Sequence, residues 1–374
     1  VPKNIFNSEN NVDLKQYIQY VERQQIVSNQ SISDTRISNS NDYYGKRVAI
    51  SEQHAIFGTV RIKVPDGVTP DTSFQGSAYI FTPNQSGEWI QQQQLVTSDN
   101  NSIVSTDKQF NDNFGYSVAI NNDYAFVGAT TYDYNKIYGS NDYDRDIGAV
   151  YVFKKDGNKW VENQRLTTPN PETNVKIGSN FGSNIYLTET YAIIGEQKFD
   201  SENKSDSGTA HIFIKDSLGK WIHSQQLLSN DSKQGDNFGN SVSIDGNHAI
   251  VGAYHRDFVN SSDIVSTDGG VAYIFQKDAD GWQQQKKISV NDIEEDDNFG
   301  ISVSIKGNYA VIGSFNDDSI VFQEPVINSS QPEPDFTSGE SEQPEPEPEP
   351  EPEAQPEPNF IYTRNAGSAY IFYY

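Results

Sequence analysis

Apolar residues in this chain fall into short runs, separated by polar segments rich in Asn, Asp, Ser and Gly. The second repeat illustrates the pattern: apolar runs cover 118–120, 124–129 and 148–153, and a fourth begins at Trp160 and reaches Leu166. The runs are rich in Val, Ile, Tyr and Phe and are shorter than most helices. They therefore predict β-strands, which we letter A to D within each repeat.

The set of four predicted strands recurs with a period of about sixty residues, a spacing that is typical of β-propeller blades. We expect an all-β fold, a single five-bladed β-propeller of four-stranded antiparallel blades that covers residues 20–374. The expected blades span 43–95, 113–166, 180–227, 237–288 and 298–374, and residues 20–26 complete the last one.

The two ends of the chain predict how the ring closes. The fifth repeat stops after its C strand and lacks the Trp-led D strand of the other repeats. Residues 20–26 align with 89–95, with Tyr20 in the place of Trp89. An N-terminal strand that completes the last blade would remove open strand edges. Residues 1–19 form an N-terminal extension to which no role is assigned.

Loop length varies on one side of the predicted blades. The A–B and C–D links are short, and every long segment is a B–C loop or a D–A loop. These two kinds of loop share one face of an up-and-down blade, so we expect a binding surface there. The longest insertion is 315–366, whose Pro-Glu repeat at 343–358 favours extended polyproline II. A solvated insertion is the favoured interpretation, and a recognition arm is the alternative.

Composition narrows the class of partner. The chain has 374 residues, a net charge of −25 and no Cys or Met. Nucleic acid and anionic membrane surfaces need basic clusters, so they are excluded as partners. No apolar run approaches the ~18 residues of a membrane span, and we expect no membrane insertion. Disulfides are excluded, and the missing initiator Met indicates a processed or trimmed chain from which a signal peptide could have been removed.

Four Phe-Gly pairs open the repeats, at 114–115, 181–182, 238–239 and 299–300, and strand B ends in Val-Gly-Ala at 127–129 and 251–253. These motifs resemble the FG-GAP repeat family, known from integrin alpha-subunit propellers and bacterial surface proteins, although the final Pro is absent. The resemblance covers nearly all of 20–374. It implies extracellular adhesion or ligand binding as a family tendency. The integrin calcium loops do not carry over, because the A–B links here are too short to surround a cation.

The B–C loop of the second repeat, 130–147, is the richest in aromatic and acidic residues. Its candidate ligand contacts for a sugar or protein are Tyr132, Tyr134, Tyr138, Tyr143 and Arg145. The spacing of the first three ligands in a calcium loop is matched by Asp142, Asp144 and Asp146, but Ile147 and Phe153 stand where Gly and Glu are needed. Calcium is therefore a possible cofactor here, and a solvated loop with packed tyrosines is the alternative.

Other ionisable residues recur at repeat positions. Aspartates in the D–A loops, such as Asp231 and Asp236, fit turn caps better than a ring of metal sites. His54, His211, His223 and His248 lie in predicted strands and are expected to pack. Only His255, beside Arg256 and Asp257 in a B–C loop, is placed for chemistry.

The chain contains no Gly-x-Ser-x-Gly, His-Glu-x-x-His or phosphate-loop motif, so the sequence predicts a protein that is not an enzyme. We expect a secreted or cell-surface adhesion module that recognises a glycan or a protein through the long loops. A polysaccharide-acting hydrolase or lyase is one alternative. A structural building block of a surface layer or filament is another. The identity of the ligand and the oligomeric state do not follow from the sequence.

Overall fold

A computed structural model describes residues 45–59, 76–97, 112–132, 147–169, 178–259, 265–290, 293–317, 319–322, 360–363 and 367–373. The chain divides into two compact units, 1–171 and 172–374, and each is described by itself. The described residues form an all-β structure without a helix, as the apolar pattern predicts. None of these residues belongs to a helix of the length and apolar character that a bilayer span requires.

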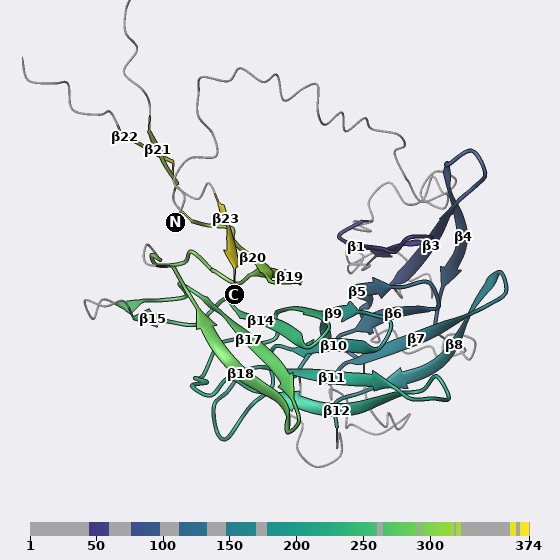
Figure 1. The fold of residues 1–374 in the computed structure, drawn as a ribbon, viewed down its shortest axis with the longest axis horizontal. Helices are drawn as coiled ribbons and strands as arrows, with labels where there is room; N and C mark the ends of the chain where they lie inside the picture. The colour runs from purple at the N-terminus through teal and green to yellow at the C-terminus, as the bar shows by residue number, and fades with distance from the viewer. Residues whose placement is uncertain are drawn as a thin grey trace, which may run out of the picture. The chain divides into compact units, whose positions relative to one another are not determined.

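The first unit contains two antiparallel four-stranded sheets, in the orders β1-β2-β3-β4 and β5-β6-β7-β8 (Figure 1). The strands of the first sheet are β1 (Arg47–Ile50), β2 (Ala55–Thr59), β3 (Ser77–Pro83) and β4 (Trp89–Leu95). Those of the second sheet are β5 (Phe114–Ile120), β6 (Tyr124–Ala129), β7 (Ala149–Asp156) and β8 (Lys159–Leu166). Sequential strands are neighbours in both sheets, so each repeat folds as one meander.

The second unit contains two more four-stranded sheets, one three-stranded sheet and two ribbons. The third sheet consists of β9 (Phe181–Leu187), β10 (Tyr191–Glu196), β11 (Thr209–Lys215) and β12 (Trp221–Leu227). The fourth consists of β13 (Ser241–Asp245), β14 (His248–Ala253), β17 (Val271–Asp278) and β18 (Gly281–Ile288). The fifth consists of β19 (Ser302–Lys306), β20 (Tyr309–Ser314) and β23 (Ser368–Tyr373). The ribbons pair β15 (Phe258–Val259) with β16 (Val265–Ser266), and β21 (Ser319–Phe322) with β22 (Phe360–Thr363).

Four of the five repeats thus form the predicted four-stranded sheet. The fifth shows three described strands, and the segment 20–26, which is expected to supply its fourth strand, lies outside the described residues. The insertion 315–366, expected as a loop, carries the β21–β22 ribbon near its two ends, where short runs of Ile, Val, Phe and Tyr occur. The Pro-Glu repeat at 343–358 also lies outside the described residues.

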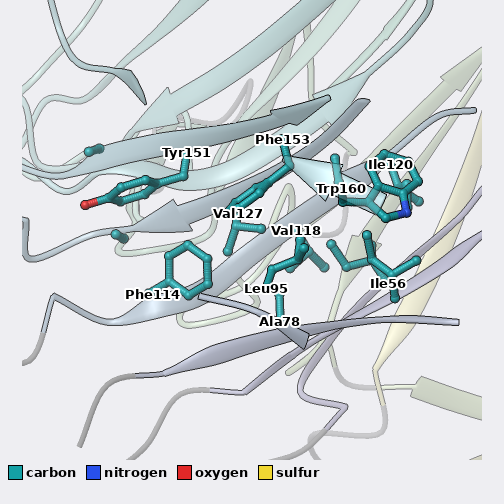
Figure 2. Close-up of a cluster of buried hydrophobic side chains, with 14 residues drawn as sticks. Ile56, Ala78, Leu95, Phe114, Val118, Ile120, Val127, Tyr151, Phe153 and Trp160 are labelled. Carbon is teal, nitrogen blue, oxygen red and sulfur yellow. The ribbon is translucent and has the colours of Figure 1, made fainter. Parts of the chain in front are cut away.

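Each sheet packs an apolar face against the next sheet of its unit. In the first unit, Ile56 and Leu95 lie against Val118 and Val127, with Trp160 at one end of the cluster (Figure 2). In the second unit, one buried cluster joins the third and fourth sheets and another joins the fourth and fifth. The period-two alternation of the strands therefore places one apolar set on each side of a sheet.

The Phe-Gly motif is explained by a close backbone approach between consecutive sheets. Gly300 has φ of +92° and Asn298, two residues earlier, has φ of +56°, so the turn before β19 is left-handed at both positions. The carbonyl of Gly300 then lies against Gly252 of the preceding sheet, where a Cβ would be 2.0 Å from that oxygen. This contact excludes a side chain at Gly252, and at Gly300 a side chain is excluded by the positive φ and by the Val271 carbonyl oxygen, 2.4 Å from where a Cβ would lie.

Candidate functional site

One backbone position recurs at the start of every described B–C loop that leads into a C strand. The N–H of the glycine before the C strand donates to the carbonyl of the residue three positions after strand B, over 2.9–3.2 Å. We call this residue the loop anchor. The loop anchors of the second to fifth repeats are Tyr132, Phe199, Arg256 and Asp317. The shared backbone contact holds four chemically different side chains at one place in the repeat.

In the fourth repeat the loop anchor is a buried arginine. Arg256 is only 3% exposed, and its Nη1 donates to Oδ2 of Asp236 over 2.6 Å. Its Nη2 donates to Oδ2 of Asp231 over 3.1 Å, and Asp231 also accepts from the Tyr273 hydroxyl and from Nζ of Lys287. One arginine thus joins the B–C loop to the D–A loop that leads to the same sheet.

The two carboxylates differ in environment. Burial raises the pKa of Asp236 above its ordinary value, although the Lys233 N–H and Arg256 oppose the change. Burial also acts on Asp231, but hydrogen bonds from Lys287 and Tyr273 and the charge of Arg256 outweigh it and lower the pKa. The side chain of Asp231 is 43% exposed and that of Asp236 is 3% exposed. Asp236 is therefore the structural partner of Arg256, and Asp231 reaches the surface.

His255 lies next to this network without joining it in the contacts described. Its Nδ1 is 3.1 Å from Oδ1 of Asp268, and its ring is 4.0 Å from that of Tyr254. The sequence placed His255 for chemistry because it stands beside Arg256 and Asp257. In the structure the neighbouring Arg256, which sequence reasoning did not single out, is the residue that organises the loop.

The predicted ligand loop of the second repeat is described only at its two ends. Tyr132 is half-buried, its ring packs edge-on to Tyr151, and the Arg165 guanidinium lies 4.6 Å from its centre. The other candidates of this loop lie outside the described residues: Tyr134, Tyr138, Tyr143, Arg145, Asp142, Asp144 and Asp146. Tyr132 itself serves as a loop anchor packed on its own sheet.

A buried polar cluster in the third repeat was not predicted from the sequence. In the third repeat, Glu196 at the end of strand B accepts from Nε2 of His211 over 2.8 Å, and both side chains are buried. The other ring nitrogen of His211 lies 3.2 Å from Nε2 of His223. Burial and the neighbouring His211 lower the pKa of His223 to about 4. The paired replacement of Ala by Glu and of Tyr by His at these repeat positions was the signal that could have revealed the cluster.

The recurring aspartates include the expected turn caps. Asp236 accepts from the backbone N–H of Lys233, and Asp297 accepts from that of Glu294, each over 2.7 Å. Asp231 instead binds side chains. Among the residues that the structure describes, no group of three His, Asp or Glu side chains is arranged to hold a metal ion.

Comparison with known proteins agrees with the repeat pattern. The model of the FG-GAP repeat matches residues 89–153, 221–275 and 282–324. No curated protein sequence matches the chain. Among solved structures, the periplasmic gluconolactonase PpgL of Pseudomonas aeruginosa is similar at 14% identity and a TM-score of 0.41. The match covers 75% of this chain and 66% of that enzyme, just under two thirds of its length, and is too weak to indicate a shared activity.

The three matched segments lie in both units and include at least one strand of each of the five sheets, while β1–β3, β8–β11 and β23 lie outside them. The Phe-Gly turns and the glycines packed against them supply the structural basis of the match. The chain contains FG-GAP repeats in these three segments.

Proposed function

We propose that this protein is an extracellular or cell-surface binding module that recognises a glycan or a protein through its B–C and D–A loops. The observation that carries the proposal is that these loops are joined to one another by backbone hydrogen bonds. Asn237 donates to Asp206 over 3.0 Å, and Asn298 donates to Asp268 over 3.1 Å. Variable loops on a rigid sheet scaffold are the usual basis of a binding surface.

The ion pairs of the fourth repeat support the same proposal. Arg256 and Asp236 fix the B–C loop to the D–A loop, so the neighbouring exposed side chains are held in place. A preorganised surface loses less conformational entropy when a ligand binds. The chain's net charge of −25 favours neutral or basic partners over anionic ones.

A polysaccharide-acting hydrolase or lyase is a less favoured function. Such an enzyme needs carboxylates that converge on the substrate. Asp231 and Asp236, the two loop carboxylates that the fourth repeat brings together, are both bound to Arg256. Release of reducing ends from a panel of polysaccharides would establish turnover and would replace the binding proposal with this alternative.

Binding is tested by probing the purified protein on a glycan array and on an array of cell-surface proteins. Reproducible binding to one ligand class, without turnover of that ligand, supports the proposal. The absence of any bound glycan or protein would contradict it. Calcium at Asp142, Asp144 and Asp146 remains part of the proposal: chelation is expected to lower the melting temperature, and added calcium to restore it.

We also propose that the five repeats close into one ring, with 20–26 as the missing strand of the last blade. Two exposed apolar faces support closure, each within its own unit. Val48 of β1 is 62% exposed, and Ile371 of β23 is 74% exposed. Val311 and Ile371 pair across β20 and β23 as Ile56 and Ile80 pair across β2 and β3 in the first repeat, where both isoleucines are fully buried.

The ring is tested by placing a charge on one of these faces. If Val48 is buried by closure, V48D should lower the free energy of unfolding by more than about 3 kcal/mol, because a buried charge lacks a partner. The control is L218D, since Leu218 lies in a C–D hairpin and is 82% exposed. Equal stability of the two variants would contradict closure.

A further inference from the structure

The B–C loop of the third repeat and the end of β12 border a shallow, open surface pocket of about 320 Å³. Its lining combines two apolar side chains, Phe199 and Leu228, with the polar side chains of Asp200, Glu202 and Gln226. The volume lies at the lower end of the range for small-molecule sites. Phe199 is the loop anchor of this repeat, so the pocket is built on a position that carries a different side chain in each of the four repeats where it is described.

The loop that forms one wall is held by its own hydrogen bonds. Ser207 donates its hydroxyl to the carbonyl of Phe199 over 3.2 Å, and its Oγ lies 2.8 Å from Oγ of Ser201. Oδ1 of Asp200 accepts from the N–H of Asp206 over 2.8 Å. Ser201 and Ser207 are both buried. The pocket wall is therefore internally braced before any ligand arrives.

The same loop stores backbone strain. Glu202, Asn203 and Asp206 have φ of +46°, +70° and +53°. Asn and Asp adopt this region with local hydrogen bonding, but a glutamate there is uncommon. The strained turn presents Glu202 at the rim of the pocket, where its side chain is exposed. Such strain persists where the surrounding structure holds it, and it often accompanies a binding function.

The chemistry of the lining indicates a hydroxyl-rich and uncharged ligand. An aromatic ring and an aliphatic side chain match the C–H face of a sugar ring, whereas carboxylates and an amide accept hydrogen bonds from hydroxyl groups. The lining has two carboxylates and no cationic side chain, so it opposes sulfated or carboxylated sugars. The charge of the whole chain acts in the same direction.

We propose that this pocket binds a neutral sugar unit, with its ring against Phe199 and its hydroxyls toward Asp200, Glu202 and Gln226. The proposal rests on the binding function proposed above, and it locates the sugar site in the third repeat. A basic peptide that places a Lys or Arg side chain between Asp200 and Glu202 is the competing ligand class, and the test separates the two.

The test uses the full chain and five neutral monosaccharides: glucose, galactose, mannose, fucose and N-acetylglucosamine. Saturation-transfer NMR identifies which of them binds, and a titration of that sugar then gives its affinity. F199A is expected to weaken binding by about tenfold, because it removes the apolar contact with the ring. Q226A is expected to weaken it several-fold, and E202Q less, because Gln still accepts a hydrogen bond. L218A, at the opposite end of the same sheet, is the matched control and should bind normally.

Three outcomes would overturn the proposal, and they are distinguishable. Sugar binding that is unchanged in both F199A and Q226A would place the site elsewhere and would leave the binding function intact. Binding only to basic peptides, lost in E202Q and steeply reduced by salt, would identify the competing class. No binding to any monosaccharide, glycan or protein would contradict the proposed function together with the pocket. Q226A serves as the decisive variant if F199A fails to fold.

Discussion

Arg256 binds two carboxylates that differ mainly in burial, so replacing each in turn measures what burial contributes. The perturbations are D236N and D231N. Asn at 236 keeps an oxygen for the Lys233 N–H, so the turn cap is retained while the charge is removed. Asn at 231 likewise keeps an acceptor for the Tyr273 hydroxyl. Both variants therefore remove one negative charge from the same arginine, and D231N also removes the exposed ion pair between Asp231 and Lys287.

The expected costs follow from the exposure of each partner. In D236N the Arg256 guanidinium stays buried without its buried counter-ion, a situation that costs about 3–5 kcal/mol. In D231N the lost partner is 43% exposed, and such a pair contributes about 0–1 kcal/mol. For a unit of this size the difference corresponds to a change in melting temperature on the order of 10 °C.

Equilibrium unfolding in urea, followed by tryptophan fluorescence, measures both free energies. The double variant R256M/D236N tests the cause, because it removes both members of the buried pair. It should recover at least half of the stability lost in D236N, since no uncompensated charge remains. Equal losses in D231N and D236N, or no recovery in the double variant, would refute the reasoning from burial.

Three further variants test other parts of the fold. G252A should destabilise the protein by several kcal/mol, because its Cβ would lie 2.0 Å from the Gly300 carbonyl oxygen; urea unfolding measures the loss. Burial and the nearby Lys155 lower the pKa of His54 to about 4, so the unfolded chain binds more protons between pH 4 and the unfolded value near 6.5. Stability should be complete above that window and should fall as the pH drops through it, and H54Q should reduce this pH dependence. E196A/H211Y restores the residue types of the neighbouring repeats and should be more stable than the sum of its single variants predicts, by about 1–3 kcal/mol in a double-mutant cycle.

Each of these expectations has a matched comparison. G307A is the control for G252A, because a Cβ at Gly307 meets no atom within 4 Å, and only its φ of +55° opposes alanine. A loss in G307A as large as that in G252A would argue against the close approach. An H54Q variant with the pH profile of the original protein would remove His54 as the cause. Additive effects of E196A and H211Y would show that the two side chains do not stabilise each other.

The strands could be predicted from the sequence because their signals are local. Each repeat carries these signals within short stretches of sequence: alternating apolar residues mark the strands, short links such as 121–123 join them, and a Trp begins most D strands. The four-stranded sheets follow from this order, since sequential strands in a meander pair with their neighbours. The Phe-Gly pairs were visible as a family motif, but their reason was not. It lies in the contact of Gly300 with Gly252 on the preceding sheet.

The polar clusters required the tertiary structure because their members are distant in the chain and buried by other strands. Asp231 and Asp236 look alike in sequence, yet only the fold buries one and leaves the other at the surface. Glu196 and His211 meet across paired strands, fifteen positions apart, and each residue alone reads as an ordinary strand position. Burial and partner geometry decide which charges organise a loop, and both are set by the packing of sheets rather than by any local pattern.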